Sequence, residues 1–434
     1  MAISKLHIEN FRGIEEDTEV DIKPITIFVG PNSSGKSSCI HALACLSQTI
    51  KVTADNRPLV LDDEFADVHL GRFIEVIHSK SYQDQIGLGI SLDNVTITDI
   101  EFEKKEDGTN DVKREEKTGS LKSFYKFKCS KRTQEISLES FEVDFNGPLF
   151  SGKRSKEAYT ITTKNQKVQL PIMDALGNSF LLDETSLLIN STESGLNSTK
   201  SRLKIFEYVS TQSAQSEILS ALNKTLYLGP FRQPPARRYA SRGAAPSEVG
   251  PMGESTITML ANESIQSNSR PHLTQIAKWL LHMKLAKGID VNRIGSSDLF
   301  NVNLTLSDGE KFPLADLGYG LSQVLPVLTQ CSFAPMGATL LFEQPELHVH
   351  PLASKGLAKV FVDTVKLKDA KVCLETHSPD LIRAFFQEVS KGNLSKDDLQ
   401  IYNVRRVGQK TQLKKIEVDE YGDNYENWEK DLSF

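Results

Sequence analysis

The chain has 434 residues, of which 39% are hydrophobic and 26 are glycine, the composition of a folded protein with about two or three domains. The chain has 51 Lys and Arg and 57 Asp and Glu, a net charge of −6. This charge excludes a protein that coats nucleic acid with a uniformly basic surface. The five cysteines form no C-x-x-C pair, which argues against a zinc site or a disulfide framework. No signal stretch or apolar run of about 18 residues is present, so we expect a cytoplasmic protein without membrane contact.

The chain is predicted to begin with three strands and a phosphate-binding loop. Alternation of apolar and polar residues predicts strands over residues 4–11 and 18–22, and the apolar run 25–29 predicts a buried strand. Residues 30–37 then form a complete G-x-x-x-x-G-K-S loop, called the P-loop below, and a helical stretch follows it. This strand, loop and helix order makes a chance Gly/Ser turn a poor alternative.

The P-loop predicts that the chain binds ATP and Mg²⁺. Backbone N–H groups in such a loop and in the first helical turn lack intrahelical partners, so they favour phosphate. Lys36 is expected to reach the β and γ phosphates, and the Ser37 hydroxyl is expected to ligate Mg²⁺. The expected nucleotide-binding residues of this segment are Asn32, Ser33, Ser34, Gly35, Lys36, Ser37 and Ser38.

The middle of the chain is predicted to hold a β-rich insertion. Residues 86–102 alternate as a strand, and the charge-dense stretch 103–117 predicts a solvated hairpin tip or loop. Residues 124–182 are β-rich, and the Ser/Thr/Asn-rich stretch 190–201 predicts an exposed loop. Apolar spacing then predicts a helix over residues 272–287, whose core face consists of Leu273, Ile276, Leu280 and Met283.

The last third of the chain is predicted to supply the other residues of the nucleotide site. The apolar strand 338–343 ends in Glu343, the form of a Walker B element, and a carboxylate at that end of a sheet can hold magnesium. A second short strand, 371–375, precedes His377, which could hydrogen-bond a γ-phosphate or the attacking water. A lone histidine would more often be structural, but here it accompanies three other elements.

Two glycines predict a second anion-binding segment. Gly318 and Gly320 come before a predicted helix over 324–331, with Ser322 and Gln323 at its start, and N–H groups exposed there favour an anion. The γ-phosphate already faces its own P-loop, so this segment would serve a nucleotide held by another subunit. It therefore predicts a homodimer, or a higher homo-oligomer, assembled through ATP. The alternative is a simple Gly-rich helix cap.

These motifs together resemble the ABC-type ATPases of the SMC, RecF and OLD group, in particular the short bacterial AAA-type members without a long coiled coil. The resemblance rests on residues 10–13, the P-loop, the degenerate signature at 318–323, EQPELHVHP at 343–351 and THSPD at 376–380. It implies an α/β fold, an ABC-type P-loop ATPase head with a mixed β-sheet and an inserted β-rich and helical lobe. The expected division is 1–102 and 301–434 for the head and 103–300 for the lobe.

The resemblance also implies roles for individual residues. Arg12 would lie near the nucleotide, Glu343 would serve the magnesium, and His377 would be the switch histidine. Residues 346–350 would cross the dimer interface. The segment 227–232 also resembles an element of these ATPases. Its arginine and three that follow could contact phosphates of DNA or RNA, or could equally brace a lobe: Arg232, Arg237, Arg238 and Arg242.

Two positions depart from the family pattern. The residue after the magnesium acid is usually a glutamate that acts as general base, but here it is Gln344, which cannot usefully accept a proton near neutral pH. Hydrolysis is then slow, or Glu346 or His377 orients the water, or the glutamine is an engineered trap. Too few residues follow His377 for the metal-nuclease domain of the OLD nucleases, and they predict two strands, 399–404 and 412–418.

The leading hypothesis is therefore an ATPase that dimerises around ATP and regulates a separate effector, such as a nuclease, as similar ATPases do in bacterial anti-phage defence. The alternative is a RecF-like DNA repair or maintenance ATPase that binds nucleic acid directly. A transporter subunit is disfavoured, because the standard LSGGQ signature is missing and the insertion is large.

Overall fold

The computed structural model describes residues 2–52, 57–104, 110–172, 176, 180–182, 205–240 and 246–419. They divide into two compact units, a β-rich unit (Met1–Asp21 and His41–Lys224) and a P-loop unit (Ile22–Ile40 and Thr225–Phe434). This division differs from the predicted one. The first strand pairs with strands of the insertion, and the segment after Lys224 packs with the P-loop.

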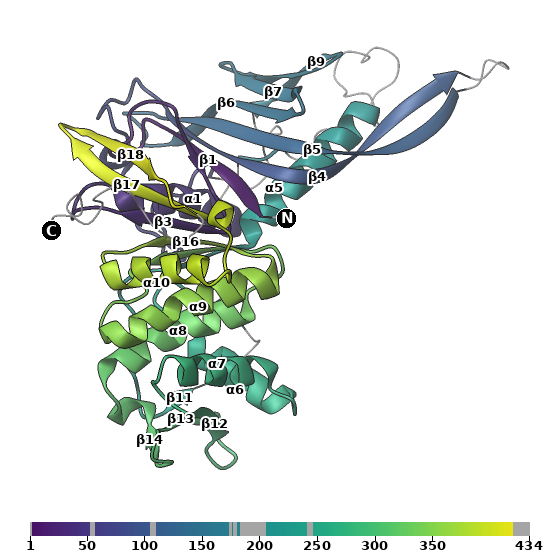
Figure 1. Cartoon of the computed structure of the whole chain (residues 1–434). Helices are drawn as coiled ribbons and strands as arrows, with labels where there is room; N and C mark the ends of the chain where they lie inside the picture. Colours follow the sequence, from purple (N-terminus) through teal and green to yellow (C-terminus); the bar gives the residue numbers. More distant parts are fainter. Residues whose placement is uncertain are drawn as a thin grey trace. The chain divides into compact units, whose positions relative to one another are not determined.

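The β-rich unit is built on an eight-stranded antiparallel sheet in the order β2-β1-β4-β5-β6-β7-β8-β9 (Figure 1). Helix α5 (Ile205–Asn223) packs against β4, and the unit also contains the short helix α2 (Phe73–Val76). The strands are β1 (Ile3–Glu9), β2 (Thr18–Asp21), β4 (Ile86–Lys104), β5 (Asn110–Cys129), β6 (Ile136–Phe145), β7 (Pro148–Arg154), β8 (Ala158–Thr163) and β9 (Lys167–Pro171).

The long ribbon of β4 and β5 corrects one prediction. The two strands stay paired as far as Lys104 and Asn110, so most of the stretch 103–117, predicted as a hairpin tip or loop, consists of the paired strands themselves. Glu115 lies directly opposite Asp99 in the ribbon, and Lys117, a diagonal neighbour of Asp99, pairs with both carboxylates, at 2.8 Å from Asp99 Oδ2 and 3.5 Å from Glu115 Oε2. Residues 105–109, and the predicted loop at 190–201, lie outside the described residues.

The P-loop unit is built on a six-stranded sheet in the order β10-β15-β16-β3-β17-β18. All neighbours are parallel except β17 and β18, so the sheet is mixed, as predicted. Every residue of β3 and β15 is buried, which is typical of parallel strands covered on both faces. The strands are β3 (Ile25–Val29), β10 (Thr225–Leu228), β15 (Thr339–Glu343), β16 (Lys371–Glu375), β17 (Leu399–Val407) and β18 (Lys410–Ile416).

Helices accompany these parallel strands. They are α1 (Lys36–Lys51), which starts at the P-loop, α8 (Tyr319–Phe333), α9 (Pro351–Lys368) and α10 (Pro379–Ser390), with short 3-10 turns at Leu314–Asp316 and Lys396–Asp398. Helix α9 connects β15 to β16, and α10 connects β16 to β17. The predicted strands at 25–29 and 371–375 match β3 and β16, and the two predicted tail strands form the hairpin β17–β18. Among the described residues, no helix has the length and apolar character needed to span a membrane.

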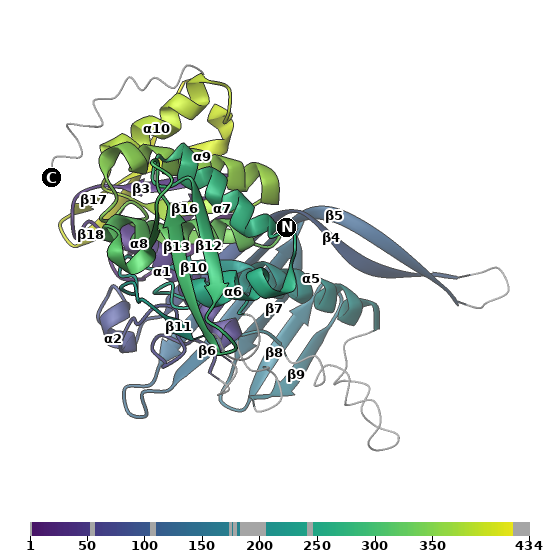
Figure 2. The ribbon, with the colours of Figure 1, turned by 90° about the horizontal axis from the view of Figure 1, so that it is seen from below.

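A smaller sheet and two helices complete the P-loop unit. Helix α6 (Thr256–Gln266) contacts β12, as Figure 2 shows, and α7 (Pro271–His282) packs on α8. The four strands of this sheet are β11 (Tyr239–Ala240), β12 (Gly288–Arg293), β13 (Leu299–Thr305) and β14 (Lys311–Pro313).

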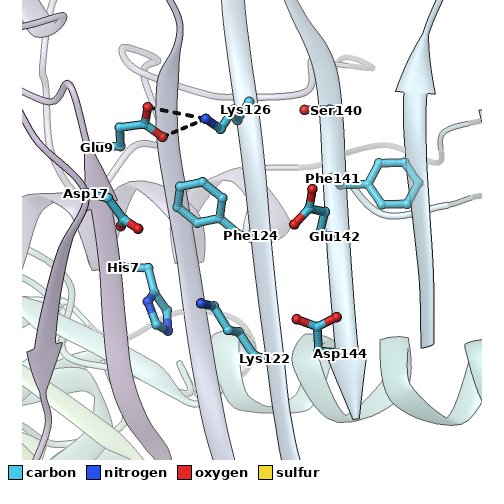
Figure 3. Close-up of a pocket in the computed structure, with 10 residues that line it drawn as sticks. All are labelled: His7, Glu9, Asp17, Lys122, Phe124, Lys126, Ser140, Phe141, Glu142 and Asp144. Atoms are coloured by element: carbon cyan, nitrogen blue, oxygen red, sulfur yellow. Dashed lines mark hydrogen bonds and ion pairs between the residues drawn. The ribbon is translucent and has the colours of Figure 1, made fainter. Parts of the chain in front are cut away.

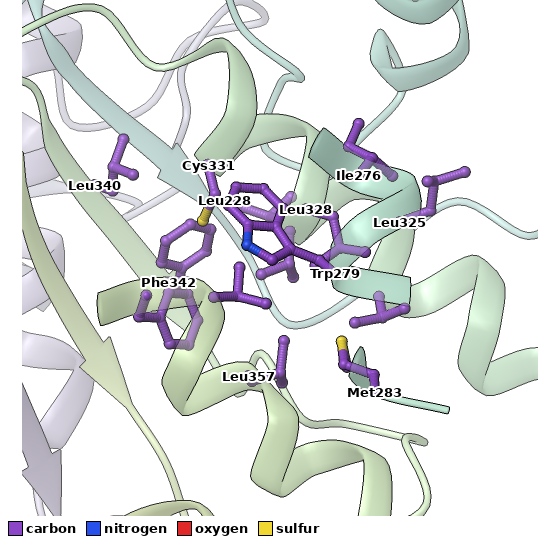
Figure 4. Close-up of a cluster of buried hydrophobic side chains, with 14 of the residues drawn as sticks. Leu228, Ile276, Trp279, Met283, Leu325, Leu328, Cys331, Leu340, Phe342 and Leu357 are labelled. Atoms are coloured by element: carbon purple, nitrogen blue, oxygen red, sulfur yellow. The ribbon is translucent and has the colours of Figure 1, made fainter. Parts of the chain in front are cut away.

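The core of the P-loop unit surrounds Trp279 of α7 (Figure 4). Its indole N–H donates to Asp363 Oδ2 at 3.0 Å. The four core residues predicted for this helix are all buried, but α7 ends at His282, five residues before the predicted end at 287, so Met283 follows the helix. Lys284 adopts φ 57, and the N–H of Leu285 reaches the carbonyl of Leu280 in a Schellman turn. A lysine in place of the usual glycine hides this end in the sequence.

Candidate nucleotide-binding site

The P-loop is supported by the C-terminal hairpin β17–β18. A Cβ at Gly30 (φ 151) would lie 2.1 Å from the carbonyl oxygen of Val404, and one at Gly35 (φ 100) would lie 2.3 Å from Thr411 Oγ1. The Thr411 hydroxyl also donates to the Ser34 carbonyl at 3.0 Å. Both glycines are therefore required by close approach, and residues from the end of the chain shape the loop.

The two key side chains of the P-loop face a carboxylate. Lys36 is only 3% exposed, and its ammonium donates to the Pro31 carbonyl at 2.7 Å and lies 3.8 Å from Glu375 Oε1. The Ser37 hydroxyl donates to Glu375 Oε2 at 2.5 Å. Burial lowers the pKa of Lys36, and the charge of Glu375 opposes this shift. The loop thus holds a desolvated cation and a hydroxyl in one place.

Glu343 and Glu375 lie side by side. They end β15 and β16 and are partners in the register of these parallel strands, and both are buried. Glu343 Oε1 accepts a hydrogen bond from the Tyr227 hydroxyl at 2.7 Å. Ser37 was expected to act with Glu343, but it donates to Glu375, because β16 and not β15 is the neighbour of β3. Sequence reasoning missed Glu375. Like Glu343, it is a carboxylate that ends an apolar strand. The order of the strands in the sheet, however, cannot be inferred from the sequence.

Arg232 holds the backbone that follows β15. Its guanidinium is 4% exposed and donates to the carbonyl of Glu343 at 3.1 Å and to that of Gln344 at 3.3 Å. Gln344 adopts φ 45, a conformation that most side chains disfavour, and its N–H donates to the Glu375 carbonyl at 2.9 Å. Burial lowers the pKa of Arg232 to about 10, and the Glu346 charge opposes this shift.

Glu346 connects the same loop to the histidine segment. Its Oε1 accepts from the Thr376 hydroxyl at 2.5 Å and from the His377 N–H at 3.2 Å. Its Oε2 is buried and has no hydrogen-bond partner among the described residues. Burial raises the pKa of Glu346.

The His377 ring lies 3.9 Å from Glu375 Oε1. Burial, with a smaller contribution from the charge of Lys36, lowers the pKa of His377. His377 therefore lies beside Glu375 and close to Lys36 of the P-loop.

The glycine segment differs from its prediction. Helix α8 begins at Tyr319, so Gly320 and Ser322 lie within its first turns and not before it. A Cβ at Gly320 would lie 2.4 Å from the His348 carbonyl oxygen, whereas one at Gly318 would meet nothing within 4 Å. The Ser322 hydroxyl donates to the Tyr319 carbonyl at 2.6 Å. The close approach of the His348 carbonyl thus explains why residue 320 is a glycine. No such contact explains the glycine at position 318.

The predicted arginines have separate surroundings. Arg12 belongs to the β-rich unit, where its guanidinium lies 2.5 Å from His41 Nδ1. Arg237 pairs with both oxygens of Asp316, at 2.6 and 3.0 Å, and Arg238 is exposed. Arg242 lies outside the described residues. Within the P-loop unit, Arg232 and Arg237 therefore brace the chain. Proximity of Arg12 to a nucleotide stays a prediction.

A cavity of about 360 Å³ lies on the sheet of the β-rich unit (Figure 3). Residues of both charges line it, and two of them, Glu9 and Lys126, form an ion pair at 2.8 Å. Its lining includes four carboxylates and only two lysines, and it includes no residue of the P-loop unit, so we do not assign the anionic nucleotide to it. The P-loop, with its cation, hydroxyl and N–H groups, has the chemistry for a triphosphate.

The sequence matches the family described as AAA ATPase domain over residues 1–382. The chain belongs to this family. A search of curated proteins finds no match. Family membership agrees with the geometry of the P-loop, and the chain is accordingly an ATPase with the predicted α/β fold.

Solved structures of SMC head domains are similar over nearly the whole chain. The SMC head domain from Thermotoga maritima is 9% identical, with 96% of this chain and 100% of that chain covered and a TM-score of 0.43. The SmcHead bound to the C-winged helix domain of ScpA is 10% identical, with 96% and 98% covered and a TM-score of 0.45. An Smc head domain with an extended coiled coil bound to the C-terminal domain of ScpA, derived from Pyrococcus furiosus, is 10% identical, with 96% of each chain covered and a TM-score of 0.45. The assignment to the ATPase family does not depend on these distant similarities.

Proposed function

We propose that this ATPase binds Mg²⁺-ATP at the P-loop, dimerises around it and hydrolyses it slowly. The observation that carries the proposal is the position of Lys36 and Ser37 beside the buried carboxylates of Glu343 and Glu375. Hydroxyl and carboxylate oxygens are the ligands that Mg²⁺ prefers, and a lysine suits phosphate oxygens. The buried Ser34 hydroxyl, which lacks a partner among the described residues, adds a donor for a phosphate.

Each group has a distinct role in this proposal. Lys36 binds the β and γ phosphates, and Ser37 and Glu343 hold the metal ion, which neutralises charge on the phosphates. The remaining phosphate contacts come from Asn32, Ser33, Ser34, Gly35 and Ser38. His377 hydrogen-bonds the γ-phosphate or the attacking water. Because the Gln344 amide cannot take a proton from that water, the ATP-bound state is long-lived.

Dimerisation completes the proposed site. The first N–H groups of α8, next to Gly318, lack intrahelical partners and favour an anion, so they suit the nucleotide of a second copy. Gly320 contributes by allowing the His348 loop to approach, and Ser322 contributes by fixing the first turn of α8. A ligand shared by two copies stabilises only the joined state, so dimerisation would report ATP binding.

Sedimentation velocity tests this proposal. The wild-type chain should sediment as a monomer without nucleotide and as a dimer with Mg²⁺-ATP. Lys36→Ala should remain monomeric under both conditions, because it loses the phosphate contact. Lys278, an exposed residue of α7, provides the matched control, and Lys278→Ala should dimerise like the wild type. A dimer of equal strength in Lys36→Ala would contradict the sandwich arrangement.

We further propose that the dimer regulates a separate effector, such as a nuclease in anti-phage defence. Arg232 and Arg237 are engaged within the P-loop unit, which favours a protein partner over nucleic acid. Purification of the chain from native cells, followed by mass identification of what accompanies it, tests this step. A stable nuclease partner would support it, and nucleic acid alone would favour the RecF-like alternative.

A further inference from the structure

We propose that Glu375 is a metal-binding residue, and that the magnesium site consists of Ser37, Glu343 and Glu375. This inference rests on the proposed function, since it concerns the metal ion that accompanies ATP at the P-loop. It adds a carboxylate that no motif of the chain identifies.

The strand order places Glu375 closest to the P-loop. β16 lies directly beside β3, so Glu375 pairs in register with Phe28, two residues before the loop begins at Gly30. β15, which carries Glu343, is one strand further away. The Ser37 hydroxyl, the expected metal ligand of the P-loop, donates to Glu375 Oε2 at 2.5 Å. A carboxylate that can accept from this hydroxyl is within reach of a cation bound to it.

Charge balance also calls for a cation at this position. Glu343 is 7% exposed and Glu375 is 5% exposed, and neighbouring parallel strands lie only about 4.8 Å apart. Two carboxylates so close repel each other in a desolvated site. The Lys36 ammonium, at 3.8 Å from Glu375 Oε1, supplies a counter-charge. When a triphosphate draws Lys36 toward itself, the carboxylate pair loses that charge, and a divalent cation replaces it.

The experiment measures metal binding and nucleotide binding separately. Mn²⁺, which replaces Mg²⁺ and is visible by electron paramagnetic resonance, is titrated into the full chain with a non-hydrolysable ATP analogue. The same analogue, made fluorescent, is titrated in EDTA. Glu375→Gln should lower the affinity for Mn²⁺ about tenfold or more. It should bind the analogue in EDTA at least as tightly as the wild type, because a charge that repels phosphate is removed.

Matched variants complete the design. Glu343→Gln should also lose Mn²⁺ affinity. Glu388→Gln, a buried glutamate of α10 that bonds Lys391 and Asn393, should not. If Glu375→Gln unfolds, Glu375→Asp keeps the charge and should bind Mn²⁺ with intermediate affinity.

Two results would overturn the inference. Unchanged Mn²⁺ affinity in Glu375→Gln would remove it from the metal site. Weaker binding of the analogue in EDTA would mean that Glu375 acts by positioning Lys36. Either result leaves the proposed function standing. That function fails instead if the wild type binds the analogue no better than Lys36→Ala.

Discussion

The Ser37 hydroxyl donates to Glu375 Oε2 at 2.5 Å, across a separation of 338 residues in the sequence. The contact joins the P-loop to the end of β16, so the nucleotide site assembles only when both ends of the chain have folded together. The hairpin β17–β18, which contacts Gly30 and Gly35, adds a third distant segment. Substitutions that disrupt the hairpin β17–β18 should therefore also disrupt the conformation of the P-loop.

Gln344→Glu should raise the rate of ATP hydrolysis. It would supply a carboxylate at the position of the usual general base, and such groups contribute about a hundredfold or more. Steady-state phosphate release measures the effect, and Gln344→Ala, which supplies no base, is the control. An unchanged or lower rate in Gln344→Glu would remove residue 344 from the base position.

Gly318→Ala and Gly320→Ala separate an anion-binding segment from a simple helix cap. Gly320→Ala would place a Cβ 2.4 Å from the His348 carbonyl, so it should lower the melting temperature. Gly318→Ala meets open space at φ −54, so it should leave the melting temperature unchanged and weaken ATP-dependent dimerisation. If Gly318→Ala dimerises like the wild type, the cap alternative is correct.

Arg232→Met should destabilise the P-loop unit by about 3–5 kcal/mol, because it removes a buried cation that bonds the carbonyls of Glu343 and Gln344 and offsets the charge of Glu346. Arg237→Ala breaks an exposed ion pair and should cost less than about 1 kcal/mol. Urea unfolding compares the two variants.

Binding of single-stranded and duplex DNA distinguishes the alternative function. A double variant, Arg237→Ala with Arg238→Ala, should leave the binding of the chain to DNA unchanged if the partner is a protein. Salt-sensitive DNA binding that this variant loses would favour the RecF-like alternative.

Stability of the β-rich unit should fall as the pH drops from 6.5 toward 4. Burial, aided by the charge of Lys122, lowers the pKa of His7 to about 4. The unfolded chain takes up a proton in this window and the folded chain does not, so protonation favours unfolding by about 2 kcal/mol at pH 5. His7→Gln retains a group that can bond Ser91, and it should flatten this dependence in urea unfolding. An equal slope in both proteins would show that His7 does not cause it.

Local motifs predicted the P-loop and the strands beside it, because each depends on residues close in sequence. The order of those strands depends on long-range packing, and for this reason Glu375 escaped notice while Glu343 did not. The end of α7 was missed because Lys284 occupies a position where glycine is the usual signal. The charged stretch 103–117 was predicted as a hairpin tip or loop, but its strands extend further than expected, since cross-strand pairs such as Asp99 with Lys117 cannot be identified from the sequence.

Equilibrium titration of a fluorescent ATP analogue into the wild-type chain and Lys36→Ala tests the central claim most directly. In the presence of Mg²⁺, the wild type should bind about one analogue per chain, and Lys36→Ala should bind at least about a hundredfold more weakly, because a buried cation that faces the phosphates is lost. Equal binding by both proteins would place the nucleotide elsewhere and contradict the account.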